Sequence, residues 1–168
     1  AAARAAANPE EELGAAETAL ERALLAVRRG GAATLDLRRA RFGRASLGRF
    51  PSKADFFWDV ASLLPACAGL RVLRLDGTAP GPAGVLVLAR ALPGAAGLRE
   101  LSLGENGLGD AEAAELAEGL ARNGTLKTLS LRDNCIATGA VALARALLSN
   151  AVQTLSLSPS LPPSLPPS

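Results

Sequence analysis

The sequence predicts an α/β fold, a short solenoid in which about five parallel strands form a concave sheet, helices lie on the convex side and an N-terminal helix caps one end. Two observations carry this prediction. The pattern L-x-x-L-x-L, followed by a polar residue, recurs at equal spacing from Leu70, Leu98 and Leu126, and each copy is followed by apolar residues at helical spacing. A third agrees with them: 49% of the 168 residues are apolar, mostly Leu, Ala and Val, which is ample for a buried core.

The clearest copy of the repeat spans residues 98–125. Its strand half has leucines at the first, fourth and sixth positions and Asn at the ninth, and the next copy repeats this order from residue 126. The predicted structural positions of the two copies are Leu98, Leu101, Leu103, Asn106, Leu126, Leu129, Leu131 and Asn134. Because strand side chains alternate, the leucines should point into the core. The Asn amide offers a donor and an acceptor and can satisfy backbone groups where each strand turns away, whereas Thr78 in the preceding copy can do only part of this.

This unit, a strand and a helix that ends in L-A-x-x-L, resembles the ribonuclease-inhibitor-like class of the leucine-rich-repeat family over about residues 20–157. The resemblance implies a parallel concave sheet with helices outside. It also implies a role in binding other proteins, since proteins with this module generally act as inhibitors, sensors or scaffolds.

The N-terminal region divides into an Ala-rich tail, residues 1–7, and the start of the repeat domain, expected over residues 8–157. Asn8 and Pro9, followed by three Glu, indicate a helix start, because they supply a capping side chain, a first-turn proline and acids over the positive end of the dipole. The helix should continue to about Arg29 and end at Gly30. We expect it to shield the open end of the solenoid from water.

Some copies depart from the regular pattern. The first strand, residues 34–37, is separated from the next by more than one repeat length, and the surplus lies in a basic insertion, residues 38–53, with two aromatics. In the last helix the apolar stripe is expected at Ala140, Leu143, Ala144 and Leu147. A final strand is expected within residues 152–157, and residues 158–168 form a Pro/Ser-rich C-terminal tail. This tail favours polyproline II, and we expect both tails to be docked on a partner.

Two surfaces are candidates for protein binding. The concave positions are small, polar and mixed in charge and lack aromatic anchors, so a merely solvated face is the alternative there. The insertion is more distinctive, because nine basic residues between Arg22 and Lys53 face a single acid. The predicted binding residues are Arg38, Arg39, Arg41, Phe42, Arg44, Arg49, Phe50, Arg74, Asp76, Glu100 and Arg132.

The composition argues against catalysis. The chain has no His and no Tyr, and its Gly-rich turns lack the Lys-Ser/Thr of a phosphate-binding loop, so we expect no enzyme and no cofactor. The acids at residues 110, 112 and 115 are interpreted as a solvated helix face rather than a metal site. Asn123-Gly124-Thr125 is interpreted as a turn rather than a glycosylation site. No apolar run approaches the length of a membrane span.

The two cysteines, Cys67 and Cys135, lie at non-equivalent repeat positions, which favours an intracellular, reducing compartment. The opening AAARAAA could be the remnant of a plastid or mitochondrial transit peptide, and the lack of Met indicates a processed chain or a fragment.

The function expected from these observations is a non-catalytic protein-protein interaction module, an accessory or structural subunit of a larger assembly that could be organellar. Two alternatives remain. One is an RNA-associated accessory protein that uses the basic loop 38–53 on phosphates, and the other is a fragment of a leucine-rich-repeat regulator or receptor.

Overall fold

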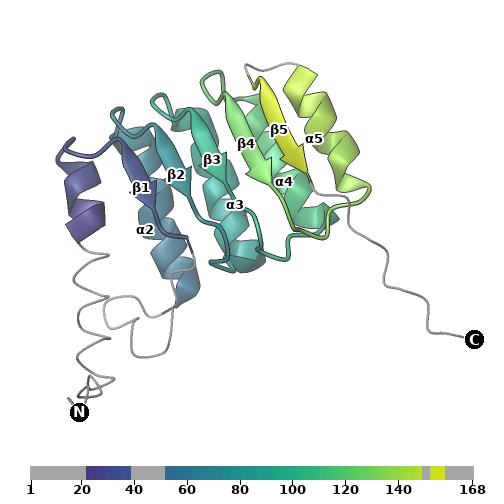
Figure 1. Cartoon of the computed structure of the whole chain (residues 1–168), viewed down its shortest axis with the longest axis horizontal. Helices are drawn as coiled ribbons and strands as arrows, with labels where there is room; N and C mark the ends of the chain where they lie inside the picture. The colour runs from purple at the N-terminus through teal and green to yellow at the C-terminus, as the bar shows by residue number, and fades with distance from the viewer. Residues whose placement is uncertain (1–21, 39–51, 149–151, 158–168) are drawn as a thin grey trace, which may run out of the picture.

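The computed structural model describes residues 22–38, 52–148 and 152–157. In this part of the chain, strands and helices alternate and form two layers, a sheet on one side and helices on the other (Figure 1). The sheet has five parallel strands in sequence order. The predicted α/β solenoid of about five strands is confirmed.

The five strands are β1 (Thr34–Asp36), β2 (Val72–Arg74), β3 (Glu100–Ser102), β4 (Thr128–Leu131) and β5 (Thr154–Leu157). The labelled helices are α2 (Lys53–Ala66), α3 (Gly81–Ala91), α4 (Asp110–Ala121) and α5 (Gly139–Leu148), and a short 3-10 helix, η1 (Leu92–Gly94), follows α3. Residues 22–28 are also helical. None of the described helices combines the length and the apolar character needed to cross a membrane.

The strand register follows the leucines of the repeat. The aligned column is Leu35, Leu73, Leu101, Leu129 and Leu155. The six predicted core leucines of the third and fourth strand segments are each at most 1% exposed. Burial of one such side chain contributes about 1.5–3 kcal/mol, so the leucine columns are the main favourable term of the core.

Asn134 closes the turn after β4, as the sequence predicts. Its Nδ2 donates to the carbonyl oxygens of Leu103 and Leu131 at 2.9 and 3.0 Å. Its Oδ1 accepts from the backbone N–H groups of Asn106 and Leu108 at 3.1 and 3.0 Å. The buried amide therefore satisfies backbone groups of its own repeat and of the preceding one.

Asn106 does the same for the turn one repeat earlier, with fewer bonds. Its Nδ2 donates to the Leu75 carbonyl at 2.9 Å and its Oδ1 accepts from the Ala79 N–H at 2.8 Å. Thr78 contributes only a hydroxyl, which donates to the same Leu75 carbonyl at 2.7 Å. The expectation that Thr could replace Asn only in part is confirmed.

The N-terminal helix ends where the sequence predicts. Gly30 has a φ of +71°, a conformation that glycine adopts without strain. The N–H groups of Gly30 and Gly31 bond back to the carbonyls of Val27 and Ala26, both at 2.9 Å. Val27 is buried in the same core as the leucines, so the described part of this helix covers the first repeat.

The predicted stripe of α5 is wrong at Ala144, which is exposed. The buried residues of α5 are Gly139, Leu143 and Ala146. Ala117, the counterpart of Ala144 on α4, lies at the junction with α5. Among the described residues no further helix packs beyond α5, so the same position on α5 faces outward.

Several predictions fall outside the described residues. They concern the two tails, residues 1–7 and 158–168, the helix start at Asn8 and residues 39–51 of the basic insertion. These stay predictions.

Candidate protein-binding surface

An open groove of about 650 Å³ lies on the concave face, at the carboxyl ends of the strands. Four successive repeats contribute its lining, which is polar and charged. The lining residues are Asp36, Arg38, Asp76, Ser102, Gly104, Glu105, Ser130, Arg132 and Asp133. The parallel sheet brings these residues together because each lies at or just after the carboxyl end of the strand of its own repeat.

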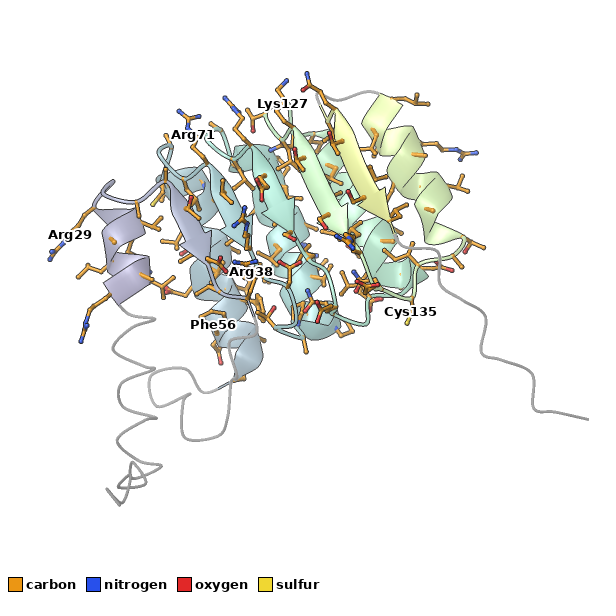
Figure 2. All side chains as sticks on the ribbon, viewed as in Figure 1. Arg29, Arg38, Phe56, Arg71, Lys127 and Cys135 are labelled. Carbon is orange, nitrogen blue, oxygen red and sulfur yellow. The ribbon has the colours of Figure 1, made fainter. Side chains whose placement is uncertain are left out.

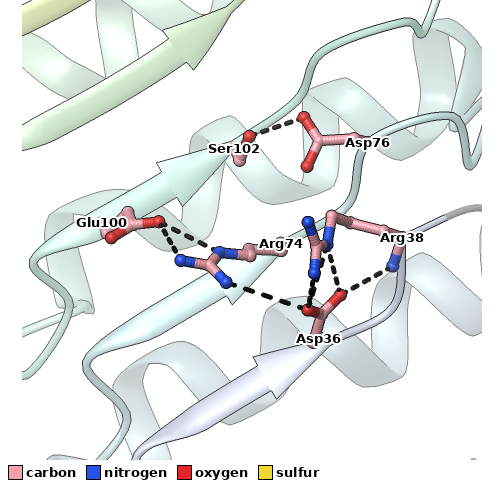
Figure 3. A network of polar contacts seen from close by, with 6 residues as sticks. All are labelled: Asp36, Arg38, Arg74, Asp76, Glu100 and Ser102. Atoms are coloured by element: carbon pink, nitrogen blue, oxygen red, sulfur yellow. Dashed lines mark hydrogen bonds and ion pairs between the residues drawn. The ribbon is translucent and has the colours of Figure 1, made fainter.

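A chain of ion pairs crosses the first three strands beside this groove (Figure 3). The Arg38 guanidinium binds the Asp36 carboxylate through Nε at 2.9 Å and Nη2 at 2.7 Å. Arg74 lies 3.9 Å from the same carboxylate and donates to Glu100 Oε1 through Nε at 3.1 Å and Nη2 at 3.0 Å. The hydrogen bond from the Arg38 side chain lowers the pKa of Asp36, and the bond to Asp36 raises the pKa of Arg38. The four side chains therefore hold one another in place.

A second polar contact joins the strand ends of β2 and β3. Oδ1 of Asp76 accepts from the Ser102 hydroxyl at 2.5 Å and from the Gly104 N–H at 2.7 Å. A Cβ atom at Gly104 would lie 2.7 Å from that oxygen and 3.2 Å from the Arg132 carbonyl oxygen. Glycine suits this position because a Cβ atom there would have to displace the Asp76 carboxylate.

The turn that bounds the groove uses a left-handed residue in three repeats. Gly77, Glu105 and Asp133 occupy equivalent positions, with φ values of 66°, 55° and 55°. Sequence reasoning did not select Glu105 or Asp133 as binding residues, although both line the groove. The sequence signal that could have found them is Gly77. A glycine at this repeat position indicates a backbone with positive φ, which Glu105 and Asp133 share at the equivalent positions.

The structure brings five of the predicted binding residues to this face. Arg38, Asp76 and Arg132 line the groove, and Arg74 and Glu100 form the ion pair beside it. The other six predicted residues, Arg39, Arg41, Phe42, Arg44, Arg49 and Phe50, lie outside the described residues. Asp36 and Ser102 were not selected, because the sequence does not show which of the concave side chains bond across strands.

Two acids of α4 have a structural role that the interpretation as a solvated face missed. The Asp110 carboxylate accepts from the backbone N–H groups of Ala137 and Gly139 at 2.7 and 2.8 Å and from the Thr138 hydroxyl at 2.6 Å. The Thr138 hydroxyl is the largest cause that lowers the pKa of Asp110 to about 2, followed by the two N–H groups. Asp110 thus caps α5.

Glu112 caps its own helix, because its Oε2 accepts from the Gly109 N–H at 3.0 Å. Within the described residues, no three His, Cys, Asp or Glu side chains are grouped so that they could hold a metal ion.

Asn123 holds the turn between α4 and β4, as interpreted from the sequence. Its side chain is 2% exposed, and Nδ2 donates to the Leu92 carbonyl at 2.6 Å. Its Oδ1 accepts from the N–H groups of Thr125 and Leu126 at 2.9 and 2.8 Å. The nitrogen that a glycan would modify is therefore engaged inside the fold.

Comparison with known proteins supports the architecture. No protein-family model matches the chain, and no curated protein matches it in sequence. Among solved structures, the domain described as leiomodin-1 actin-binding site 2 resembles it with a TM-score of 0.70 at 14% identity, covering 84% of this chain and 80% of that one. The chain has a leucine-rich-repeat-like fold. At this identity the likeness shows the fold alone.

Proposed function

We propose that this chain is a non-catalytic protein-interaction module that binds a segment of another protein in the concave groove. The observation that carries the proposal is the set of charged and hydroxyl side chains that four repeats present together to solvent. Because Asp36, Arg38 and Asp76 are already held by hydrogen bonds, a partner meets a prearranged surface and loses less side-chain entropy on binding.

Arg132 and Asp133 are the groove residues best placed to contact a partner. Both are exposed, and in the described part of the chain neither side chain makes a hydrogen bond or an ion pair. Charged side chains at the rim of an interface chiefly set specificity and association rate. We therefore expect Arg132 to select partners with acidic groups that fit beside it.

The comparison supports a protein as the partner. The leiomodin-1 domain with this fold is described as an actin-binding site. We propose actin as the first partner to test, by co-sedimentation and pull-down with the full chain.

The deciding experiment compares Arg132→Glu with a matched control. Arg145→Glu makes the same charge change on an exposed position of α5, outside the groove. Each tagged full-length variant is used to capture proteins from the cells that produce the chain, after mild cross-linking. A protein retained by the wild type and by R145E, and lost with R132E, supports the proposal. If no captured protein depends on Arg132, or if capture depends on Arg145 instead, the concave groove is not the binding surface.

The finer role proposed is that of an accessory subunit of a larger assembly, built from repeats of the ribonuclease-inhibitor-like class. The strand-plus-helix unit, as in residues 98–125, supports the class. The alternative role in RNA binding rests on the insertion 38–53, of which residues 39–51 lie outside the described residues. Native purification with and without ribonuclease separates the two, because only an RNA-linked complex would be lost on digestion.

A further inference from the structure

A second charged surface lies at the amino ends of the strands, away from the groove, where the turns lead from each helix into the next strand. Arg71, Arg99 and Lys127 each directly precede a strand, and the strand register aligns them in three neighbouring repeats. Neighbouring strands are about 4.8 Å apart, so the three residues form a regular column. Arg71 and Lys127 are seen along this edge in Figure 2. We call this column the basic edge.

No carboxylate neutralises the basic edge in the described part of the chain. The three turns that carry it, residues 66–71, 93–99 and 122–127, contain no Asp or Glu. The acid that follows Arg99 in sequence, Glu100, is bound to Arg74 on the concave face. The acids of the groove lie at the other ends of the strands. The small net charge of +2 therefore conceals a local excess of positive charge.

Hydrogen bonds to the next repeat fix two of the three basic groups. Nη1 of Arg71 donates to the Gly97 carbonyl at 3.1 Å, and Nη1 of Arg99 donates to the Thr125 carbonyl at 3.0 Å. A guanidinium has five N–H donors, so each keeps donors for another ligand.

These bonds give Arg71 and Arg99 a structural role within the fold, but they do not account for a basic side chain at Lys127. The ammonium of Lys127 makes no hydrogen bond within the described residues, although it continues the column. A basic group at this position therefore has no intramolecular partner to account for it.

We propose that the basic edge docks an acidic segment of a partner protein, laid across the strands. Guanidinium groups pair with carboxylates through two parallel hydrogen bonds, which suits the arginines of the column. Alternate side chains of an extended segment are about 6.6–6.8 Å apart, which is more than the spacing between neighbouring strands. The long Arg and Lys side chains can reach far enough to make up this difference.

A protein segment fits this edge better than a single-stranded nucleic acid. Sites for single-stranded nucleic acid combine basic residues with aromatic side chains on which bases stack. The three described turns of the basic edge contain no aromatic residue. The exposed aromatic side chain of the described residues, Trp58, belongs to α2 in the outer layer.

The test measures the fluorescence anisotropy of a labelled peptide of alternating Glu and Ser with the full chain at low ionic strength. Lys127→Gln is the primary variant, because it removes charge without breaking a hydrogen bond. The double variant R71Q/K127Q is compared with R90Q/R145Q, which removes the same charge from exposed positions of α3 and α5. Urea titration of each variant verifies that it is folded.

The expected result is binding weakened roughly two- to five-fold by K127Q and roughly five- to twenty-fold by R71Q/K127Q, with less than about a two-fold effect of the control. Added salt should weaken the wild-type interaction. Capture of an Arg132-dependent partner should be unchanged in K127Q, so this proposal and the proposed function can fail separately.

Three outcomes would overturn the proposal. The first is no measurable peptide binding by the wild type, and the second is an equal loss in the two double variants. The third is preference for another occupant: tighter binding of a uridine oligonucleotide of matched charge would assign the edge to nucleic acid, and salt-sensitive self-association lost in K127Q would assign it to a second copy of the chain.

Discussion

Replacing three asparagines one at a time by alanine should destabilise the protein in a fixed order. In the structure Asn106 makes two hydrogen bonds of 2.9 Å or less with backbone groups. Asn123 makes three with Leu92, Thr125 and Leu126. Asn134 makes four of 3.1 Å or less. N106A should be the least destabilising of the three variants, N123A intermediate and N134A the most destabilising.

The magnitude follows from the number of bonds lost. A net contribution of about 1 kcal/mol per hydrogen bond gives about 2, 3 and 4 kcal/mol for the three variants. The burial of Asn123 and Asn134, 2% and 5% exposed, works in the same direction, because water cannot replace the lost amide at their backbone partners. N134A should therefore lose a large part of the stability of a domain of this size.

The assay is urea unfolding followed by far-ultraviolet circular dichroism, from which the midpoint and the m-value of each variant are obtained. Equal m-values would indicate that the variants unfold as one unit, so that the midpoints compare stability directly. An N106A variant that costs as much as N134A, or an N134A variant that costs less than about 1 kcal/mol, would contradict the predicted order. Either result would mean that the leucine core, rather than the amides, holds the turns.

Three further predictions concern the groove and the helix caps. G104A should destabilise the fold by about 1–3 kcal/mol in urea unfolding, because its Cβ would displace the Asp76 carboxylate, and an unchanged midpoint would contradict this. G77A should cost about 1 kcal/mol in the same assay, because an L side chain is strained at its φ of 66°, and an unchanged midpoint would contradict this. The pKa of Asp110 is lowered from 3.8 to about 2 in the fold, so the stability that its carboxylate contributes is present above pH 3.8 and is lost as the pH falls toward 2. The difference in Tm between wild type and D110A should shrink over that pH range. A constant difference would argue against the cap.

The fold was predictable because the leucines carry both the period and the burial pattern. Leu101 and Leu129 are equivalent in sequence, in strand register and in burial. The prediction failed at Ala144, where the pattern continued but the packing did not. A periodic sequence specifies contacts between neighbouring units and contains no signal for the point where a neighbour is missing.

The candidate site was predictable only in outline. Alternation along the strands identified Arg74, Asp76 and Glu100 as concave residues, and the structure places them there. The contribution of Glu105 was missed because its side chain is directed by a backbone turn with positive φ, which side-chain alternation does not describe. Hydrogen bonds that join one repeat to the next depend on register, which is known only after the strands are aligned.

The asparagine contacts have a consequence for how the array can change in length. Asn134 bonds to the repeat before it at Leu103 and Leu108, and Asn106 bonds to the repeat before it at Leu75 and Ala79. Each repeat is therefore completed by the next one. Deletion of one whole unit, residues 98–125, would bring Asn134 to the place that Asn106 now holds, with the same donor and acceptor available. Loss of this whole unit would therefore preserve the amide contacts at the junction, whereas a deletion of half a unit leaves a turn that no amide reaches.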